Sequence, residues 1–245
     1  MAGKGNAYIG TSGWHYKHWR GIFYPEHLKE SEYLDFYQNH FNTVEINTSF
    51  YHLPAEKTVE KWREQAARHF RFSAKGSRYI THMKKLNQPE ETLARFFGRM
   101  ALLGEKLDTV LFQLPPRWQF NHDRLHVFLR TLTTAYRYAF EFRDVSWIRP
   151  ETYDLLARYN AAFCIYEFDG FSTSREVTAD FVYIRLHGPD GPYQGSYSEG
   201  TLADWALSIA SWTAGGKDVF CYFDNDQNAY AALNAKRLGE LVAGA

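Results

Sequence analysis

Short runs of apolar residues alternate along the chain with longer segments in which apolar positions recur at the helical period. The runs predict eight strands, which begin near Tyr8, Thr43, Arg71, Thr109, Arg137, Ala162, Phe181 and Val219. Between them the periodicity predicts helices over residues 31–41, 55–69, 89–103, 122–134, 150–159, 202–212 and 229–242. Pro89 and Pro150 stand where two of these helices begin, a position that proline favours.

The alternation of strands and helices predicts parallel strands joined by crossovers. Eight strands at a mean spacing of about 30 residues fit a single (β/α)8 TIM-type barrel that occupies the whole chain, residues 1–245, as one domain. The interval between Glu167 and Phe181 is too short for a full helix, so we expect the sixth helix to be short or missing. An open doubly wound sheet is the alternative, although no GxGxxG motif follows the first strand.

Alternation within the strands separates two sets of side chains. In a barrel, one parity faces the helices and the other faces the lumen. Apolar residues such as Val44, Ile46, Phe112 and Phe140 fit the helix side. The opposite parity then carries polar residues into the lumen near the C-terminal strand ends, namely Glu45, Asn47, Ser73, Lys75, Gln113, Glu141, Arg143, Arg185 and His187. Active sites of TIM barrels lie at that end.

Four of these residues are candidates for catalysis. His187 is the preferred general acid or base, because the ordinary pKa of histidine is near neutrality. Glu45 and Glu141 can form an acid/base or glycosidase-like pair. Lys75 can form a Schiff base if it is desolvated, or it can serve as a charge partner or anion contact. The alternative for the whole set is an internal network of ion pairs without a ligand.

The remaining polar positions predict ligand binding. Arg143 and Arg185 together indicate a bound carboxylate or phosphate. Asn47, Gln113, Asp224 and Asn225 are further candidates for contact with that ligand. Asp224 and Asp226 end the eighth strand and could hold a hard cation, but a turn rich in Asp and Asn is commoner there. No dense metal-binding spacing is present, so we predict neither a metal nor a cofactor.

Aromatic residues make up 18% of the chain, and many follow the predicted strands directly. Trp14, Tyr51, Trp147 and Tyr197 fall in such loops. Tryptophan and tyrosine on loops are typical of surfaces that stack on sugar rings or bases, so these four are predicted to form a rim around the ligand. The alternative is that they belong to the core between barrel and helices.

Charge and composition limit the classes of partner and the cellular location that the sequence is compatible with. The 28 basic and 28 acidic residues give zero net charge, which argues against nucleic acid as a partner but leaves a local basic groove possible. Cys164 and Cys221 lie in apolar runs and are expected to be buried free thiols. No apolar signal core or bilayer-spanning run is present, so we expect no membrane association and a cytoplasmic location. The pattern indicates no oligomeric state.

A set of motifs runs in order over nearly the whole chain and comprises Ile9–Trp14, Trp19–Pro25, Phe41–Asn47, Thr81–His82, Phe112–Pro116, Glu141–Arg143, Ser146–Trp147, Arg185–Gly188 and Tyr222–Asp226. Together these motifs resemble the YecE-like family, the domain-of-unknown-function family numbered 72. The resemblance implies a TIM-type barrel and no settled activity. Residues 162–168 match the family least well.

The sequence therefore predicts an enzyme that uses acid/base chemistry on a small polar molecule, anionic or sugar-like, bound at the C-terminal ends of the strands. Two other classes stay open. One is a protein that binds a small ligand without converting it, and the other is a nucleic-acid-processing protein that stacks bases on the aromatic rim.

Overall fold

Eight parallel strands form the centre of the structure, a computed structural model that describes residues 3–244. They are β1 (Ala7–Thr11), β2 (Thr43–Ile46), β3 (Arg71–Lys75), β4 (Leu107–Leu114), β5 (Arg137–Phe142), β6 (Ala162–Phe168), β8 (Phe181–Leu186) and β9 (Asp218–Phe223). Hydrogen bonds connect them in the order β1-β9-β8-β6-β5-β4-β3-β2. The predicted strands are confirmed, each beginning within two residues of the expected position.

The two ends of this strand order meet and make the barrel nearly closed. β1 and β2 are joined by one bridge, between Ser12 and Glu45, where the Gly13 amide also donates to the Glu45 carbonyl at 2.8 Å. A doubly wound sheet would leave two separate edges, so the TIM-type prediction is confirmed. The lack of a ladder between β1 and β2 leaves this seam the least hydrogen-bonded part of the barrel.

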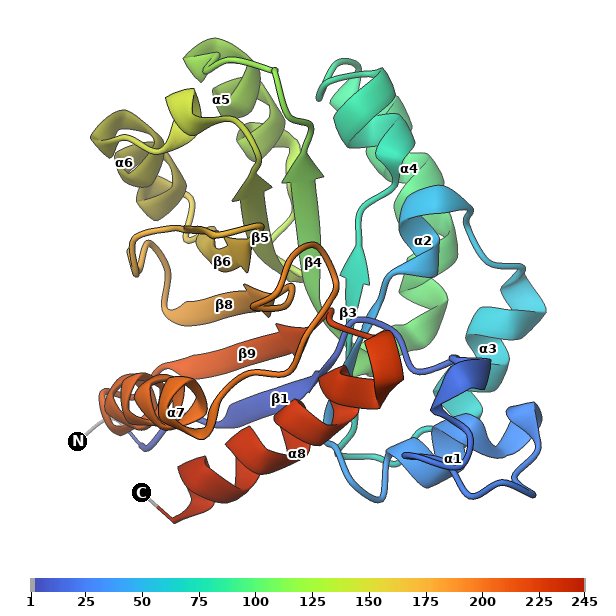
Figure 1. Ribbon diagram of the computed structural model, residues 1–245. Coiled ribbons are helices and arrows are strands. Elements are labelled where there is room, and N and C mark those ends of the chain that lie inside the picture. Colours follow the sequence, from blue (N-terminus) through green and yellow to red (C-terminus); the bar gives the residue numbers. More distant parts are fainter. Residues whose placement is uncertain (1–2, 245) are drawn as a thin grey trace.

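Helices surround the strands on the outside (Figure 1). The main ones are α1 (Tyr33–Tyr37), α3 (Glu56–Gln65), α4 (Pro89–Met100), α5 (His122–Thr131), α6 (Pro150–Arg158), α7 (Glu199–Ala214) and α8 (Tyr230–Ala243), with a one-turn α2 (Thr48–Tyr51) after β2. Short 3₁₀ or π segments occupy Lys17–Trp19, Glu30–Glu32, Tyr79–Met83, Ala101–Lys106, Val145–Trp147 and Gln227–Ala229. The first helix is shorter than predicted, because residues 30–32 form a 3₁₀ turn and α1 ends at Tyr37.

No helix separates β6 from β8, as the short interval predicted. The chain turns at Asp169 and Gly170, both with positive φ, and returns as β7 (Phe171–Ser172), antiparallel to the end of β6. Because this hairpin replaces a helix, the end of β6 and the turn project over the barrel mouth, where Phe168 and Phe171 become available to a site.

Two apolar layers confirm the parity prediction. The outer layer packs strand residues such as Val44, Phe112 and Phe140 against the helices. The inner layer fills the lumen with the opposite parity, including Leu111, Ala139, Cys164, Tyr183, Phe220 and Tyr222. The same parity continues upward into the polar residues at the C-terminal strand ends. The apolar lumen thus forms the floor beneath the charged groups.

Candidate functional site

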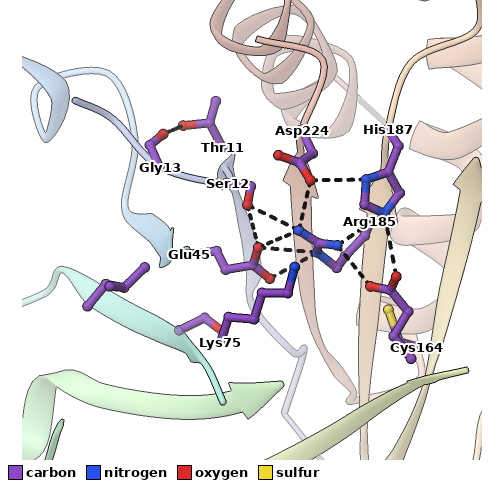
Figure 2. Close-up of polar contacts among 12 residues, drawn as sticks. Thr11, Ser12, Gly13, Glu45, Lys75, Cys164, Arg185, His187 and Asp224 are labelled. Carbon is purple, nitrogen blue, oxygen red and sulfur yellow. Dashed lines mark hydrogen bonds and ion pairs between the residues drawn. The ribbon is translucent and has the colours of Figure 1, made fainter. Parts of the chain in front are cut away.

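Arg185 lies at the centre of the polar residues, fully buried, on β8 (Figure 2). Its Nε is 3.1 Å from Oε2 of Glu45, and its Nη2 donates to Oε1 of the same carboxylate at 2.8 Å. Its Nη1 donates to Oε2 of Glu141 at 2.9 Å and to Nε2 of His187 at 3.1 Å. Nη2 also reaches Oδ2 of Asp224 at 3.0 Å. All five N–H groups of Arg185 therefore have partners inside the protein, and none is left for an external anion.

His187 is held as a neutral ring by this arrangement. Nη1 of Arg185 and Nη2 of Arg143 both lie within 3.1 Å of its Nε2, and a guanidinium can only donate. Nε2 must therefore accept, which places the proton on Nδ1, 3.0 Å from Oδ2 of Asp224 in a poorly aligned contact. Burial, with Arg185 beside it, lowers the pKa of His187 to about 4.

The carboxylates stay ionised although they are buried. Burial opposes the charged form of Glu141, but Arg143 and Arg185 outweigh it and hold its pKa below the ordinary range. Burial likewise opposes the ionised form of Asp224, and Arg185 holds its pKa below the ordinary value. Their negative charges in turn raise the pKa of Arg185, against the effect of burial. With Glu45, Lys75 and Arg143, the cluster combines three carboxylates and three cationic side chains.

Arg143 differs from Arg185 because part of it faces outward. It follows β5 with a side chain 9% exposed, its Nε paired with Oε1 of Glu141. Its guanidinium carbon lies 4.2 Å from the ring centre of Phe168 and 4.7 Å from that of Tyr166. Within residues 3–244, Nη1 of Arg143 has no hydrogen-bond acceptor. Arg143 thus keeps Nη1, with its two N–H groups, for a ligand.

Lys75 is the other cation with an unused donor. It ends β3, is 5% exposed, and its Nζ lies 4.5 Å from the ring centre of Phe50. Across the described chain, no carboxylate oxygen lies within 4.0 Å of this Nζ and no acceptor bonds to it. Figure 2 shows the amine ending beside Arg185 and Glu45 with no contact drawn to either. Burial, followed by the charge of Arg185, lowers the pKa of Lys75 to about 8.

A cavity of about 360 Å³ opens at the mouth beside Arg143. Its wall is mostly apolar, with Tyr166 and Phe168 from β6, Phe171 from the hairpin and Tyr193 from the loop after β8. Gln113, at the end of β4, supplies an amide. The volume falls in the range of small-molecule sites, about 300–1,000 Å³. An apolar wall with one cation and one amide suits a small molecule that has an anionic group.

The structure divides the predicted ligand-binding residues among several places. Gln113 and Arg143 line the mouth cavity, whereas Trp14, Asn47 and Tyr51 line a separate cleft outside the barrel. Asn225 is buried below the loop after β8, with Nδ2 donating to the Gly195 carbonyl at 2.8 Å. Asp224 belongs to the buried network.

None of the four aromatic residues predicted to form the rim lines the mouth cavity, and Trp147 and Tyr197 pack inside the protein instead. Trp147 is fully buried, and its ring stacks on Phe142 with centres 4.9 Å apart. Tyr197 is 5% exposed and its hydroxyl accepts from the Gly188 amide at 3.0 Å. Both segments fold back onto the outer layer, so these residues hold loops in place. The aromatic residues that do line the mouth are Tyr166, Phe168, Phe171 and Tyr193.

Sequence reasoning missed two members of the network. The Ser12 hydroxyl donates to Oε1 of Glu45 and accepts from Nη2 of Arg185 at 3.1 Å. The Tyr183 hydroxyl donates to Oε2 of Glu45 at 2.7 Å. Tyr183 shares the inward parity of Arg185, so alternation along β8 carried that signal. Ser12 lies just beyond β1, where alternation gives no guidance.

Three further observations concern metals, thiols and membranes. Among residues 3–244, no group of three or more His, Cys, Asp or Glu side chains is arranged to hold a metal ion. Cys164 and Cys221 are buried free thiols, as predicted. None of the helices in this range is both long and apolar enough to cross a bilayer.

The fold and the site together define a TIM-type barrel with a buried charged network under a small cavity at its C-terminal mouth. The chain belongs to the family described as "Protein of unknown function DUF72", whose model matches residues 8–245. The UPF0759 protein YunF of Bacillus subtilis is 27% identical over 269 residues, covering 96% of this chain and 94% of that protein. The UPF0759 protein YecE of Escherichia coli K12 is 31% identical over 137 residues, or 56% of this chain and 48% of that protein.

Solved structures agree with this assignment. The crystal structure of a DUF72 family protein from Thermotoga maritima superimposes with a TM-score of 0.87 at 26% identity, covering 97% of this chain and 99% of that one. A DUF72 family protein from Enterococcus faecalis matches with a TM-score of 0.80 at 19% identity, which supports the fold alone. The resemblance inferred from the sequence motifs is confirmed.

Proposed function

We propose that this barrel is an enzyme that performs acid/base chemistry on a small anionic or sugar-like molecule bound in the mouth cavity. One observation carries the proposal: in a buried network whose other donors are spent, Nη1 of Arg143 and Nζ of Lys75 have no acceptor within the described chain. Neither atom is one of the fully buried atoms without a partner, so both can be reached from outside the network, and two accessible cationic donors without protein acceptors favour a ligand that supplies acceptors.

Arg143 is the group suited to hold the anion. Its guanidinium is fixed by Glu141 on one edge and by the rings of Tyr166 and Phe168 on its face. Little side-chain freedom remains to be lost when a phosphate or carboxylate binds. Gln113 and Tyr193 line the same cavity and add an amide and a phenol for the polar parts of the molecule.

Lys75 does not line the mouth cavity itself, but its amine lies beside Arg185 and Glu45 in the charged cluster, and it is the group to which we assign the proton transfer. Its pKa of about 8 puts it close to the pH at which a general acid or base works best, and no carboxylate holds its proton in place. His187 has a lower pKa, and its Nε2 already accepts from two guanidinium groups. The proposal therefore gives His187 a positioning role, with Glu45 and Glu141 fixing the arginines.

The test begins with binding. Titration of the whole protein with inorganic phosphate, followed by a panel of sugar phosphates, should show binding that Arg143→Met weakens at least tenfold. Arg149→Met is the matched control, because Arg149 lies in the same segment between β5 and α6, pairs with Glu151 and does not line the cavity. Equal affinities in wild type and Arg143→Met would remove Arg143 from the site.

The second half of the test concerns turnover. For a molecule that binds, Lys75→Gln should abolish conversion while binding changes by less than about tenfold, and the wild-type rate should rise toward pH 8 as the amine loses its proton. If the wild-type protein binds its ligand tightly but leaves it unconverted over the whole pH range, the protein is a binding protein and not an enzyme.

A further inference from the structure

A second cavity lies outside the barrel, between the loop that follows β1 and the helix α3. Its volume is about 640 Å³, and it shares no lining residue with the mouth cavity. Three residues predicted to bind ligand, Trp14, Asn47 and Tyr51, line this aromatic cleft. Because the two cavities are separate, the proposed function at the mouth leaves these residues unexplained.

The cleft has an aromatic surface. Trp14 and Trp62 meet edge to face with ring centres 5.1 Å apart. Trp14 is 7% exposed, whereas Tyr51 at the rim is 57% exposed. Both residues line the cleft, which therefore presents aromatic surface of the kind that packs against flat rings of any composition.

One edge of the cleft is positively charged. Lys57 and Lys61 stand one turn apart on α3, both exposed, and within the described chain neither has an ion pair. The carboxylate that lines the cleft, Glu30, is already paired with His15 at 3.2 Å and with Lys17 at 3.1 Å. The two free lysines therefore leave this edge of the cleft complementary to an anion.

An acceptor without a partner belongs to another residue that lines the cleft. Oδ1 of Asn47 is buried and has no hydrogen-bond partner within the described residues. An amide oxygen left in this state costs about 1–3 kcal/mol, so a turn of the Asn47 amide that brings this oxygen to an N–H or O–H group of a ligand would be favourable. The cleft thus offers a stacking surface, a cationic edge and an acceptor that lacks a donor.

We propose that the aromatic cleft binds an aromatic anion, a molecule with a flat ring, an N–H or O–H donor on that ring, and a phosphate or carboxylate group. The ring lies against Trp14 and Tyr51, its donor reaches Oδ1 of Asn47, and the anionic group lies near Lys57 and Lys61. This inference is independent of the function proposed for the mouth.

Calorimetric titration of the full chain with two probes separates the sources of such an anion. Adenosine 5′-monophosphate carries its charge on a phosphate, and 4-aminobenzoate carries it on a carboxylate. We expect at least one to bind with accompanying quenching of tryptophan emission. The double variant Lys57→Glu/Lys61→Glu should weaken that binding at least tenfold, and Asn47→Ala should weaken it several-fold. Uncharged adenosine or aniline should bind less well than its charged counterpart.

Two variants serve as controls. Lys236→Glu reverses an exposed charge on α8, away from the cleft, and should leave the affinity unchanged. Arg143→Met removes the free donor of the mouth and should also leave it unchanged, which separates this inference from the proposed function. Absence of binding by both probes at millimolar concentration would overturn the proposal. Undiminished binding by the double lysine variant, or its loss in Arg143→Met, would do the same.

Discussion

Arg185 on β8 and Glu45 on β2 form a two-point ion pair across the barrel, with Nη2 and Nε of the guanidinium 2.8 Å and 3.1 Å from the two carboxylate oxygens. Neither side chain is exposed. Glu45 also makes the bridge to Ser12 at the seam between β1 and β2. The ion pair therefore fixes β2, the strand that has no ladder of hydrogen bonds to its neighbour β1.

Replacing Arg185 by leucine should destabilise the fold strongly. The change leaves the carboxylates of Glu45, Glu141 and Asp224 without their shared cation, and breaking a buried pair from one side costs about 3–5 kcal/mol. The free energy of unfolding from urea denaturation measures this. Arg237→Leu is the matched control, since it removes exposed ion pairs to Glu199 and Glu240 and should cost far less. Equal losses in the two variants would contradict a central role for Arg185.

The buried His187 should make stability depend on pH. Its pKa in the folded protein is about 4, below the ordinary value of about 6.5, so in this interval the unfolded chain binds a proton that the folded protein does not. The free energy of unfolding should therefore fall as pH falls from about 6.5 toward 4. His82, with a pKa also lowered to about 4, contributes in the same direction.

Two variants test the contribution of His187. His187→Gln should reduce the slope of stability against pH between about 6.5 and 4, while His27→Gln, at an exposed position, should leave it unchanged. Urea unfolding at several pH values gives both slopes. A wild-type slope that survives in His187→Gln would show that Nε2 is not held as an acceptor by the two arginines.

The strands and the charged cluster were predictable from the sequence because both depend on alternation, which is local. The period-two pattern places Val44 and Glu45 on opposite faces whatever the rest of the chain does. The distribution of hydrogen bonds within the cluster was not predictable in this way. Arg143 and Arg185 share the same parity. Only the packing of the hairpin after β6 and of β9 determines that every N–H donor of Arg185 has a partner while Nη1 of Arg143 has none.

The aromatic residues in the loops show what the sequence could not predict. Trp14, Tyr51, Trp147 and Tyr197 all follow strands, yet the structure buries Trp147 in the outer layer and exposes more than half of Tyr51. Position after a strand does not determine which way a loop folds, because loop direction depends on contacts with residues distant in sequence. For Trp147 these contacts include the Trp118 carbonyl, which accepts its ring N–H.

Gly188→Ala should displace the loop after β8 that lines the mouth cavity. Gly188 has φ of +109°, and a Cβ there would lie 2.2 Å from the Gln194 carbonyl oxygen. The loop that would have to move carries Tyr193, whose amide donates to the His187 carbonyl at 2.7 Å. We expect a loss of about 1–3 kcal/mol in the free energy of unfolding and weaker phosphate binding.

Gly98→Ala is the control for that loss. Gly98 lies inside α4, and nothing stands within 4 Å of the position its Cβ would take. Alanine there should raise stability by about 0.5–1 kcal/mol, since it favours the helix. Gly188→Ala with unchanged stability and phosphate affinity would show that the loop adapts freely and does not shape the cavity.

Lys75→Met should separate stability from function. Burial and Arg185 lower the pKa of Lys75 to about 8 from about 10.4, so the charged amine is held in the folded state at a cost at neutral pH. Methionine retains the apolar contact with Phe50 and removes the charge. The variant should therefore unfold at the same or a higher urea concentration than wild type at pH 7, with a gain on the order of 1–3 kcal/mol.

The pH dependence gives the check on this explanation. Between about pH 8 and 10.4 the unfolded wild-type chain keeps a proton on Lys75 that the folded protein has released, so wild-type stability gains from this residue as pH rises. Methionine has no such proton, and the advantage of the variant should shrink over the same interval. A variant that loses stability at pH 7 would instead mean that the Lys75 charge balances Glu45, Glu141 and Asp224, making the amine part of the structural network. If Lys75 is an unpaired amine that serves catalysis, the Lys75→Met variant should retain its stability and lose turnover. Natural sites commonly retain a destabilising group where function requires it.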